Sequence, residues 1–283
     1  MTPALSFLIV EYHCIDEVRG CLQSLRTFSG DVRWECVVVS NSEYSDAEFA
    51  AAERALDGAR LLRNERNKGY AGGVNRGLLE VGAPYVFILN PDCRLVDGGI
   101  ASLIDEFDRD PAVAVVGPRV IDGDGHLQPS CRRFPKLWSY LFARTSLRCL
   151  SLARREASRY FMEDFDHASA RCVDWVSGGA MLVKLEAVRE VGPMDERYFL
   201  YMEDVDWCCF FWAAGRKIKY VPFCTVVHDG QHKSLRMGLD ALISPHFRFH
   251  VASIVKYFSK WRNNMPRTIE RFNCKDVGGT LNG

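Results

Sequence analysis

The sequence lacks paired-cysteine motifs and long apolar runs. Its 11 cysteines are an odd number and none is spaced Cys-x-x-Cys, which excludes a zinc ribbon and a disulfide framework and favours a reducing compartment. No unbroken apolar stretch approaches the roughly 18 residues of a spanning helix. The start, MTPALSFLIVEYH, has no charged region of the kind that opens a signal peptide. We therefore expect a cytoplasmic protein that is neither secreted nor membrane-spanning.

The sequence also lacks a net charge of either sign. Lys+Arg 36 equals Asp+Glu 36, and no nucleic-acid-reading motif occurs, so we expect no nucleic-acid partner. Hydrophobic residues make up 48% and charged residues 25%, as in ordinary globular proteins. The 283 residues suffice for one compact α/β body with two lobes.

The first part of the chain alternates predicted strands with predicted helices. Apolar runs at Leu5 to Tyr12, Trp34 to Val39 and Tyr85 to Asn90 predict buried strands, and residues 18–28, 47–56 and 72–80 have helical spacing. This pattern predicts a Rossmann-like, mostly parallel sheet with flanking helices. Ligands of such sheets bind beyond the carboxyl ends of the strands, where EYHC, SNSEYSD and NPDC lie.

The pattern changes after Pro118. Residues 119–245 predict a smaller lobe, with a hairpin at DGDGH, a strand from Val173 to Val183 and two helices separated by GPMDERYF. Residues 246–283 predict an amphipathic helix to Trp261 and a mobile tail. We expect 1–118 to bind a ligand at the strand ends and 119–245 to form a second functional part.

A glycine-rich stretch, RNERNKGYAGGVNRG, precedes the predicted 72–80 helix. Its glycines would let backbone N–H groups approach an anion at the start of the helix, and a plain glycine-rich turn explains them equally well.

The strand YVFIL leads into Asn90, Pro91 and Asp92. A carboxylate there suits a hard cation such as Mg²⁺ or Mn²⁺, although Asn-Pro-Asp is also strong turn chemistry. His228 follows another apolar strand and offers a nitrogen ligand, but a lone histidine in a loop is commonly a surface residue. His232 lies nearby, yet no third ligand is spaced for zinc.

The stretch YFLYMEDVDW places Glu203, Asp204 and Asp206 among aromatic residues. Acids in the first turn of a helix complement its dipole, which explains one or two of them. A carboxylate in a partly dry cleft has a raised pKa, which suits a general base. Glu203 and Asp206 share a helix face while Asp204 points about 100° away from Glu203, so at most one of the three is the base.

Together these segments resemble the family 2 glycosyltransferases of the GT-A fold, especially the rhamnosyltransferase-like branch that elongates bacterial surface polysaccharides. The similarity covers residues 5 to 230 in the family's order. It is carried by LIVEYH, NKGYAGGVNRG, ILNPDC, the long segment from DWVSGGAM to YMEDVDWCCFFWAAG, and VVHDG, with Arg132 to Pro135 similar to the branch's RxFP element.

The resemblance implies an inverting transfer of a sugar, with rhamnose the favoured guess. The donor would be a dTDP- or UDP-linked sugar, and the acceptor a hydroxyl of a saccharide or polyprenyl-linked saccharide. Asp92 would match the metal-binding aspartate, with His228 as second ligand of Mg²⁺ or Mn²⁺. Asp204 would be the base, and Glu203 would assist it.

Other positions follow from the same resemblance. The donor side would include Tyr12, Ser40, Asn41, Asp46, Asn67, Gly69, Asn75 and Asn90. The acceptor pocket would include Arg133, Trp175, Ser177, Gly178 and Gly179.

Two positions depart from the family pattern. Ser40 stands where the family usually has an aspartate that contacts the nucleotide, with Asp46 a possible substitute. Asn90 replaces the first acid of the DxD pattern, so we expect the metal to arrive with the nucleotide. These departures keep open a nucleotide-sugar-binding or assembly protein with weak or no turnover. A sugar-nucleotide pyrophosphorylase would need a Gly-rich, Arg-containing loop after the first strand, which EYHCIDEVRG does not supply.

Two basic segments contain interleaved aromatic residues. From Cys131 to Tyr160 eight basic residues accompany one acid, and residues 247–262 mix Lys and Arg with Phe, Tyr and Trp. Such segments suit peripheral contact with an anionic membrane, and ordinary core helices with a solvated basic face account for them equally well.

Overall fold

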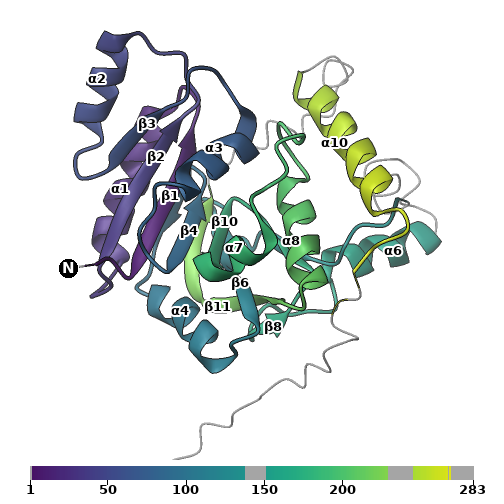
Figure 1. Cartoon of the computed structure of the whole chain (residues 1–283). Coiled ribbons are helices and arrows are strands. Elements are labelled where there is room, and N and C mark those ends of the chain that lie inside the picture. The colour runs from purple at the N-terminus through teal and green to yellow at the C-terminus, as the bar shows by residue number, and fades with distance from the viewer. Residues whose placement is uncertain (1, 138–150, 229–244, 267, 269–283) are drawn as a thin grey trace, which may run out of the picture.

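The computed structural model describes residues 2–137, 151–228, 245–266 and 268. Its centre is a nine-stranded mixed sheet in the order β3-β2-β1-β4-β10-β6-β11-β5, with β8 added beside β11 (Figure 1). The predicted α/β class is confirmed. The predicted mobile tail and the residues that surround His232 lie outside the described ranges.

The first four strands form the predicted parallel part of the sheet. β1 and β2 run in register from Leu5 opposite Trp34 to Glu11 opposite Ser40, so both strands end at the same edge. Helices connect the strands as expected. The elements are β1 (Leu5–Glu11), α1 (Ile15–Phe28), β2 (Trp34–Ser40), α2 (Asp46–Ala55), β3 (Arg60–Arg63), α3 (Gly69–Leu78) and β4 (Tyr85–Leu89).

The rest of the sheet mixes directions. β10 runs antiparallel to β4 and β6, and β11 is parallel to β6 but antiparallel to β5. The elements are β5 (Cys93–Leu95), α4 (Ile100–Arg109), β6 (Val113–Ile121), β8 (Arg171–Cys172), β10 (Ala180–Lys184), α7 (Leu185–Val191) and β11 (Lys217–His228). Because β6 itself spans residue 118, strands from both sides of the expected boundary share one sheet. The functional division at that residue stays a prediction.

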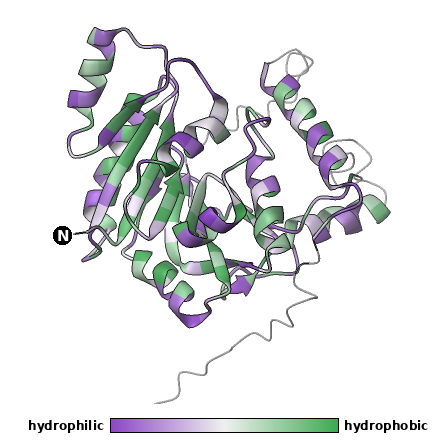
Figure 2. Cartoon of the chain, viewed as in Figure 1, coloured by the Kyte–Doolittle hydropathy of each residue, from purple (hydrophilic) through white to green (hydrophobic). Residues whose placement is uncertain are grey.

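Apolar side chains fill both faces of the sheet. Leu8 and Val10 of β1 join a cluster with α3, α7 and α8 (Glu203–Ala213), whereas Phe7 and Ile9 join a cluster with α1 and α4. This alternation follows from the two-residue period of a strand. Figure 2 shows the apolar strands in the interior, between helices that carry polar residues on their outer sides.

The single strand predicted from Val173 to Val183 is wrong. The structure has β9 (Trp175–Val176), which pairs with β7 (Cys131–Arg132), and a separate β10 in the main sheet. Between them the residues 177–179 turn, and the Ala180 N–H donates to the Ser177 carbonyl at 3.3 Å. Gly179 lies close to the end of β4, since a Cβ at this position would lie 3.2 Å from Asn90 Nδ2.

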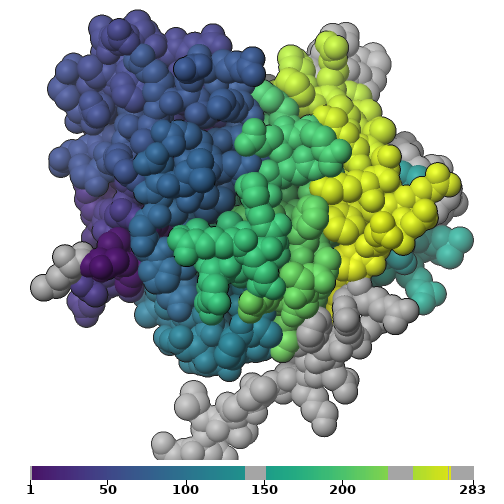
Figure 3. Space-filling model, viewed as in Figure 1, coloured from purple at the N-terminus to yellow at the C-terminus, as the bar shows by residue number. Residues whose placement is uncertain are grey.

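Two helices complete the second half. α8 (Glu203–Ala213) ends before Gly215, whose φ of 78° suits the predicted end of the helix. α10 (Pro245–Trp261) packs against α8, and α6 (Ser151–Phe161) lies on the same side of the molecule (Figures 1 and 3). Within the described ranges, no helix is both long and apolar enough to cross a membrane.

Asp206 holds α10 to α8. It is fully buried and accepts hydrogen bonds from Lys260 Nζ and Trp261 Nε1, both at 2.7 Å. Of the three acids in YMEDVDW, Asp206 therefore has a structural role. Glu203 and Asp204 remain as candidates for a chemical role.

Candidate active site

The turn at residues 177–179 brings two parts of the predicted site together. The Gly178 N–H donates to Asp204 Oδ2 at 2.9 Å, and the carbonyl of Gly179 accepts from the Asn90 N–H at 2.9 Å. Adjacent residues thus contact the start of α8 and the end of β4. Asp92, two residues beyond Asn90, therefore lies on the same side of the molecule as Asp204.

Asp92 and His228 form a pair at the sheet edge. His228 is the last residue of β11 and stands opposite Cys93 of β5, which places its Nε2 3.2 Å from Asp92 Oδ1. Asn90 Nδ2 lies 3.4 Å from the same nitrogen. Burial raises the pKa of Asp92, but the hydrogen bond and the charge of His228 outweigh it, so the pKa is lowered. Asp92 is thus an ionised carboxylate.

The donor atoms of this pair suit a divalent cation. Asp92, Cys93 and His228 each offer an atom within 4.8 Å of the others. The Cys93 thiol donates to the Gly179 carbonyl at 3.1 Å, and burial raises its pKa well above the ordinary value, so it stays protonated. One carboxylate and one imidazole remain, which fits an ion that takes its other ligands from a bound molecule.

The start of α8 is strained. Tyr201 and Met202 both have left-handed backbone, with φ of 70° and 71°. Such conformations cost about 1–3 kcal/mol each and occur where surrounding structure requires them. The consequence is that Glu203 and Asp204 occupy the first turn of the helix, beside the 177–179 turn.

Asp204 has the properties of a general base. Its two oxygens accept from the N–H groups of Gly178 and Val205, at 2.9 and 2.8 Å. Burial raises the pKa of Asp204, opposed by these hydrogen bonds and by the charge of Arg132. A carboxylate with a raised pKa accepts a proton more readily at neutral pH.

Glu203 is the more deeply buried neighbour. It is 6% exposed, and its Oε2 has no hydrogen-bond partner among the described residues. Burial and the charge of Asp204 raise the pKa of Glu203 well above its usual range. Since two adjacent carboxylates cannot ionise independently, Glu203 holds a proton while Asp204 is the more easily ionised member.

Tyr70 links the glycine stretch to this centre, and the sequence analysis did not select it. Its hydroxyl donates to the Gly178 carbonyl at 2.7 Å. Burial raises the pKa of Tyr70 well above the usual value, as do the charges of Glu203 and Asp204. Gly69 permits the approach: its φ is 74°, and a Cβ there would lie 2.3 Å from the Phe199 carbonyl oxygen.

Several predicted donor-side residues hold loops. Asn41 Nδ2 donates to the Gly69 carbonyl at 2.9 Å, and Asn67 Oδ1 accepts from the Gly69 N–H at 2.9 Å. Asn75 bonds the backbone of Met194 in both directions, at 2.8 and 2.9 Å. These side chains hold the loops at the strand ends, because many of their hydrogen bonds are made to the backbone of the protein itself.

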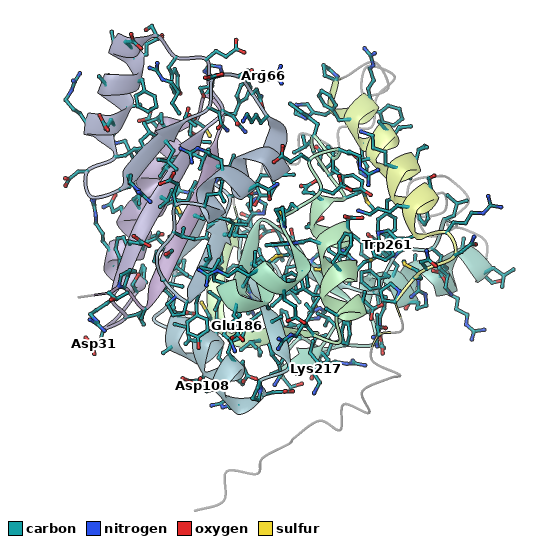
Figure 4. The ribbon with its side chains drawn as sticks, viewed as in Figure 1. Asp31, Arg66, Asp108, Glu186, Lys217 and Trp261 are labelled. Carbon is teal, nitrogen blue, oxygen red and sulfur yellow. The ribbon has the colours of Figure 1, made fainter. Side chains whose placement is uncertain are left out.

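Tyr12 and Asp46 are more open. Tyr12 is 55% exposed and its ring contacts that of His13, with centroids 4.5 Å apart. Asp46, in the first turn of α2, is exposed and pairs with Arg63 at 2.7 Å. Arg66, in the loop before α3, is labelled in Figure 4.

Glu11 is a buried acid that the sequence analysis did not select. It ends β1 opposite Ser40, and both side chains are fully buried. Glu11 accepts hydrogen bonds from the hydroxyls of Ser40 and Ser42 and from the Cys14 N–H. The family usually has an aspartate at position 40. In this chain the carboxylate lies on the neighbouring strand, at Glu11, and the Ser40 hydroxyl stands opposite it. Its only sequence signal is an acid at the end of the apolar run LSFLIV.

Exchanging these two side chains tests the pairing. Glu11→Ser alone leaves the two buried hydroxyls and the part-buried Cys14 N–H without their acceptor, at about 1–3 kcal/mol for a lost buried partner. Ser40→Glu alone places a second buried carboxylate beside the first, at about 3–5 kcal/mol for an uncompensated charge. The double variant keeps one carboxylate and one hydroxyl, so its loss of stability in urea unfolding is expected to be smaller than the sum of the single losses by at least about 2 kcal/mol. Additive losses would show that the two side chains are not coupled.

Arg133 and Arg132 differ in their surroundings. Arg133 Nη1 binds Asp174 at 3.3 Å, and the Arg133 carbonyl accepts from Trp175 Nε1 at 3.0 Å, so these two predicted pocket residues brace each other. Arg132 stands opposite Trp175 in the β7–β9 pair, with its guanidinium 5.2 Å from the indole centroid. The charge of Arg132 lowers the pKa of Asp204, so Arg132 acts electrostatically on this carboxylate.

The fold is the GT-A fold of glycosyltransferases. Two solved structures share the fold. The crystal structure of GalNAc-T7 with UDP, GalNAc and Mn²⁺ matches with a TM-score of 0.57 and 17% identity over 80% of this chain and 44% of that chain. The mannosyltransferase PcManGT from Pyrobaculum calidifontis, in complex with GDP-Man and Mn²⁺, matches with 0.57 and 15% over 92% and 65%. This chain therefore spans less than half of the first protein and about two thirds of the second.

Sequence comparison is more specific. The family described as glycosyl transferase family 2 matches residues 6–165. The N-acetylglucosaminyl-diphospho-decaprenol L-rhamnosyltransferase of Mycobacterium tuberculosis (strain H37Rv) is 30% identical over 95% of this chain and 90% of its own length. Rhamnosyltransferase WbbL of Escherichia coli (strain K12) is 32% identical over 36% of each chain. The chain belongs to glycosyltransferase family 2, as the motifs predicted, and it has rhamnosyltransferases among its relatives.

Proposed function

We propose that this chain is an inverting, metal-dependent rhamnosyltransferase. It moves the sugar from a nucleotide diphosphate donor, dTDP- or UDP-linked, to a hydroxyl of a lipid-linked saccharide in bacterial surface polysaccharide synthesis. The observation that supports the proposal is the contact of Gly178 with Asp204 and of Gly179 with Asn90, because both contacts are made by one turn. The acceptor is supported by the similarity to the N-acetylglucosaminyl-diphospho-decaprenol L-rhamnosyltransferase of Mycobacterium tuberculosis.

Asp204 carries the proton transfer in this mechanism. An acceptor hydroxyl beside the Asp204 carboxylate gives up its proton as its oxygen attacks the anomeric carbon. The bond from that carbon to the diphosphate oxygen breaks on the opposite face, so the configuration inverts and the nucleotide diphosphate leaves with the bonding electrons. Glu203, held protonated, keeps a second negative charge away from the base.

Asp92 and His228 would hold Mg²⁺ or Mn²⁺ together with the diphosphate of the donor. A bound cation neutralises the negative charge that develops on the leaving group. Asn90 orients the pair, since its amide lies beside His228 Nε2.

In this mechanism the two parts of the chain have the roles expected from the sequence. Residues 1–118 supply the donor side, with Tyr12 and Asp46 open to a nucleotide, and 119–245 supply Asp204 and the acceptor side, with Ser177 in the connecting turn. His228 belongs to the second part by sequence and to the metal site by position. We place the enzyme in the cytoplasm, at the inner face of the plasma membrane where a lipid-linked acceptor is found.

A donor panel tests this function. The purified chain with Mg²⁺ or Mn²⁺ is expected to release dTDP from dTDP-rhamnose faster when a polyprenyl-diphosphate-linked saccharide is present, and NMR of the product should show the inverted anomer. Nucleotide binding without acceptor-dependent release, for every donor tried, would instead support the nucleotide-sugar-binding alternative that the Ser40 departure raised.

A further inference from the structure

We propose that α6 and α10 form a membrane-docking face, and that a cavity between them binds the phosphate of an anionic membrane lipid. The inference rests on the proposed function only for the position of the acceptor at a membrane. Figure 3 shows α10, in yellow, covering one side of the molecule with part of α6 beside it.

α10 has two chemically different sides. Its inner side is fixed to the protein, since Tyr257 and Trp261 are buried and Ser253 Oγ donates to the Leu200 carbonyl at 2.9 Å. Its outer side carries Val251 and Val255, which are 43% and 63% exposed. The helix contains no Asp or Glu in its 17 residues. A helix that exposes apolar residues without any acid suits an anionic membrane surface.

The exposed stripe of α10 leads to the cavity. Val251, Val255, Phe258 and Arg262 are spaced by four, three and four positions and so lie on one side of the helical path. The last two line a cavity of about 310 Å³. Figure 4 shows Trp261, another lining residue, at this end of α10.

α6 leads to the same cavity from the other side. Leu152 is 76% exposed, and Leu152, Arg155 and Arg159 follow one another at helical spacing. Arg159 lines the cavity together with Lys136. The next residue, Leu137, is 48% exposed. Each of α6 and α10 therefore carries exposed apolar residues and also contributes residues to the cavity wall.

The cavity walls combine aromatic rings with cations. Phe134, Phe258 and Trp261 supply the rings, and Lys136, Arg159 and Arg262 supply the cations. Glu156 pairs with both Arg159 and Lys136, at 2.7 and 3.6 Å, and the lining Asp174 pairs with Arg133. Arg262 has no ion pair within the described residues. Among the described residues that line the cavity, three cations accompany one carboxylate, Asp174, an excess that suits a phosphate with an apolar chain attached.

Vesicle flotation tests the docking face on the full chain. Binding is expected to vesicles of phosphatidylcholine with phosphatidic acid, to weaken with rising salt, and to be absent from phosphatidylcholine alone. Arg262→Gln is expected to weaken binding about fivefold, the effect of one basic residue near such a surface. Arg54→Gln, on the exposed surface of α2, is the matched control and should bind as wild type does. Equal binding to neutral vesicles, or equal weakening by both variants, would overturn the proposal.

A soluble lipid tests the cavity itself. Dihexanoyl phosphatidic acid, below its micelle concentration, is expected to raise the Tm of the wild type and not that of Arg262→Gln. A similar rise with inorganic phosphate at equal concentration would show a free-phosphate site and overturn the lipid assignment, as would no rise with either.

Activity separates this proposal from the proposed function. Transfer to a water-soluble saccharide acceptor should be the same for Arg262→Gln and the wild type, because Arg262 lies outside the Asp92–Asp204 site. If the protein does not float with the vesicles but still transfers the sugar, only the proposed docking face is rejected. Absence of transfer in the wild type removes the proposed function and leaves the flotation result standing.

Discussion

Replacing Asp204 with asparagine is expected to lower kcat by about 10²- to 10⁴-fold, the range that a positioned general base contributes. Asparagine has nearly the same shape and keeps an oxygen that can accept from the Gly178 N–H, so the turn at 177–179 should persist. It cannot take a proton from the acceptor hydroxyl. Because the loss arises in the transition state, the donor KM should change little. Steady-state kinetics with the donor identified by the panel measure both quantities.

Glu203→Gln is the matched comparison for this loss. Glu203 is adjacent to Asp204 and is protonated, because burial and the charge of Asp204 raise its pKa, so its neutral amide analogue changes the charge of the site far less. We expect a fall of about tenfold or less in kcat, since the interaction lost is that of one neutral hydrogen-bonding group. Equal losses for the two variants, or intact transfer by Asp204→Asn, would show that Asp204 is not the base.

The pH profile gives an independent check of the same assignment. Burial raises the pKa of Asp204, and only its deprotonated form accepts a proton. Activity should therefore fall as the pH drops through this raised pKa, which puts the acidic limb of kcat above the ordinary aspartate value of about 3.9. Asp204→Asn should remove that limb from its residual activity.

The fold was largely predictable because its signals are local. The runs LSFLIVE and YVFIL are apolar throughout, as strands buried on both faces must be, and they became β1 and β4. The strand predicted from Val173 to Val183 failed for a local reason as well. Its ends are apolar enough for a strand, but Ser177, Gly178 and Gly179 between them turn the chain toward the site.

Candidate site residues could be predicted from the sequence only where a single residue stands out by its own chemistry. Asp92 and Asp204 could be selected from short motifs, because a carboxylate after a strand or in an aromatic segment is conspicuous. Glu11, Tyr70 and Arg132 could not, since their roles arise from contacts with residues 29 to 108 positions away or from a charge acting through space. The Ser40 departure illustrates this. It suggested a missing acid until the register of β1 and β2 placed Glu11 opposite it.

Replacing Asp92 with alanine is expected to have the second large effect, a fall in kcat/KM of about 10²- to 10³-fold. That range corresponds to the several kcal/mol by which a bound cation stabilises the negative charge that develops on the leaving group in the transition state. Asp92 is the ionised carboxylate of the pair with His228, and among the described residues it is the one carboxylate in this group of potential ligands, so its loss removes that ligand. The half-saturating Mn²⁺ concentration should rise, and chelation should inactivate the wild type.

The neighbouring thiol provides a control for the metal assignment. Cys93 lies within the same group of potential ligands but donates to the Gly179 carbonyl, so Cys93→Ser should keep that hydrogen bond and the Mn²⁺ dependence. Calorimetry should show that dTDP strengthens Mn²⁺ binding to the wild type and to Cys93→Ser, because two protein ligands leave most positions of the ion for phosphate and water. An unchanged Mn²⁺ requirement in Asp92→Ala, or a requirement lost in Cys93→Ser, would place the cation elsewhere in the molecule.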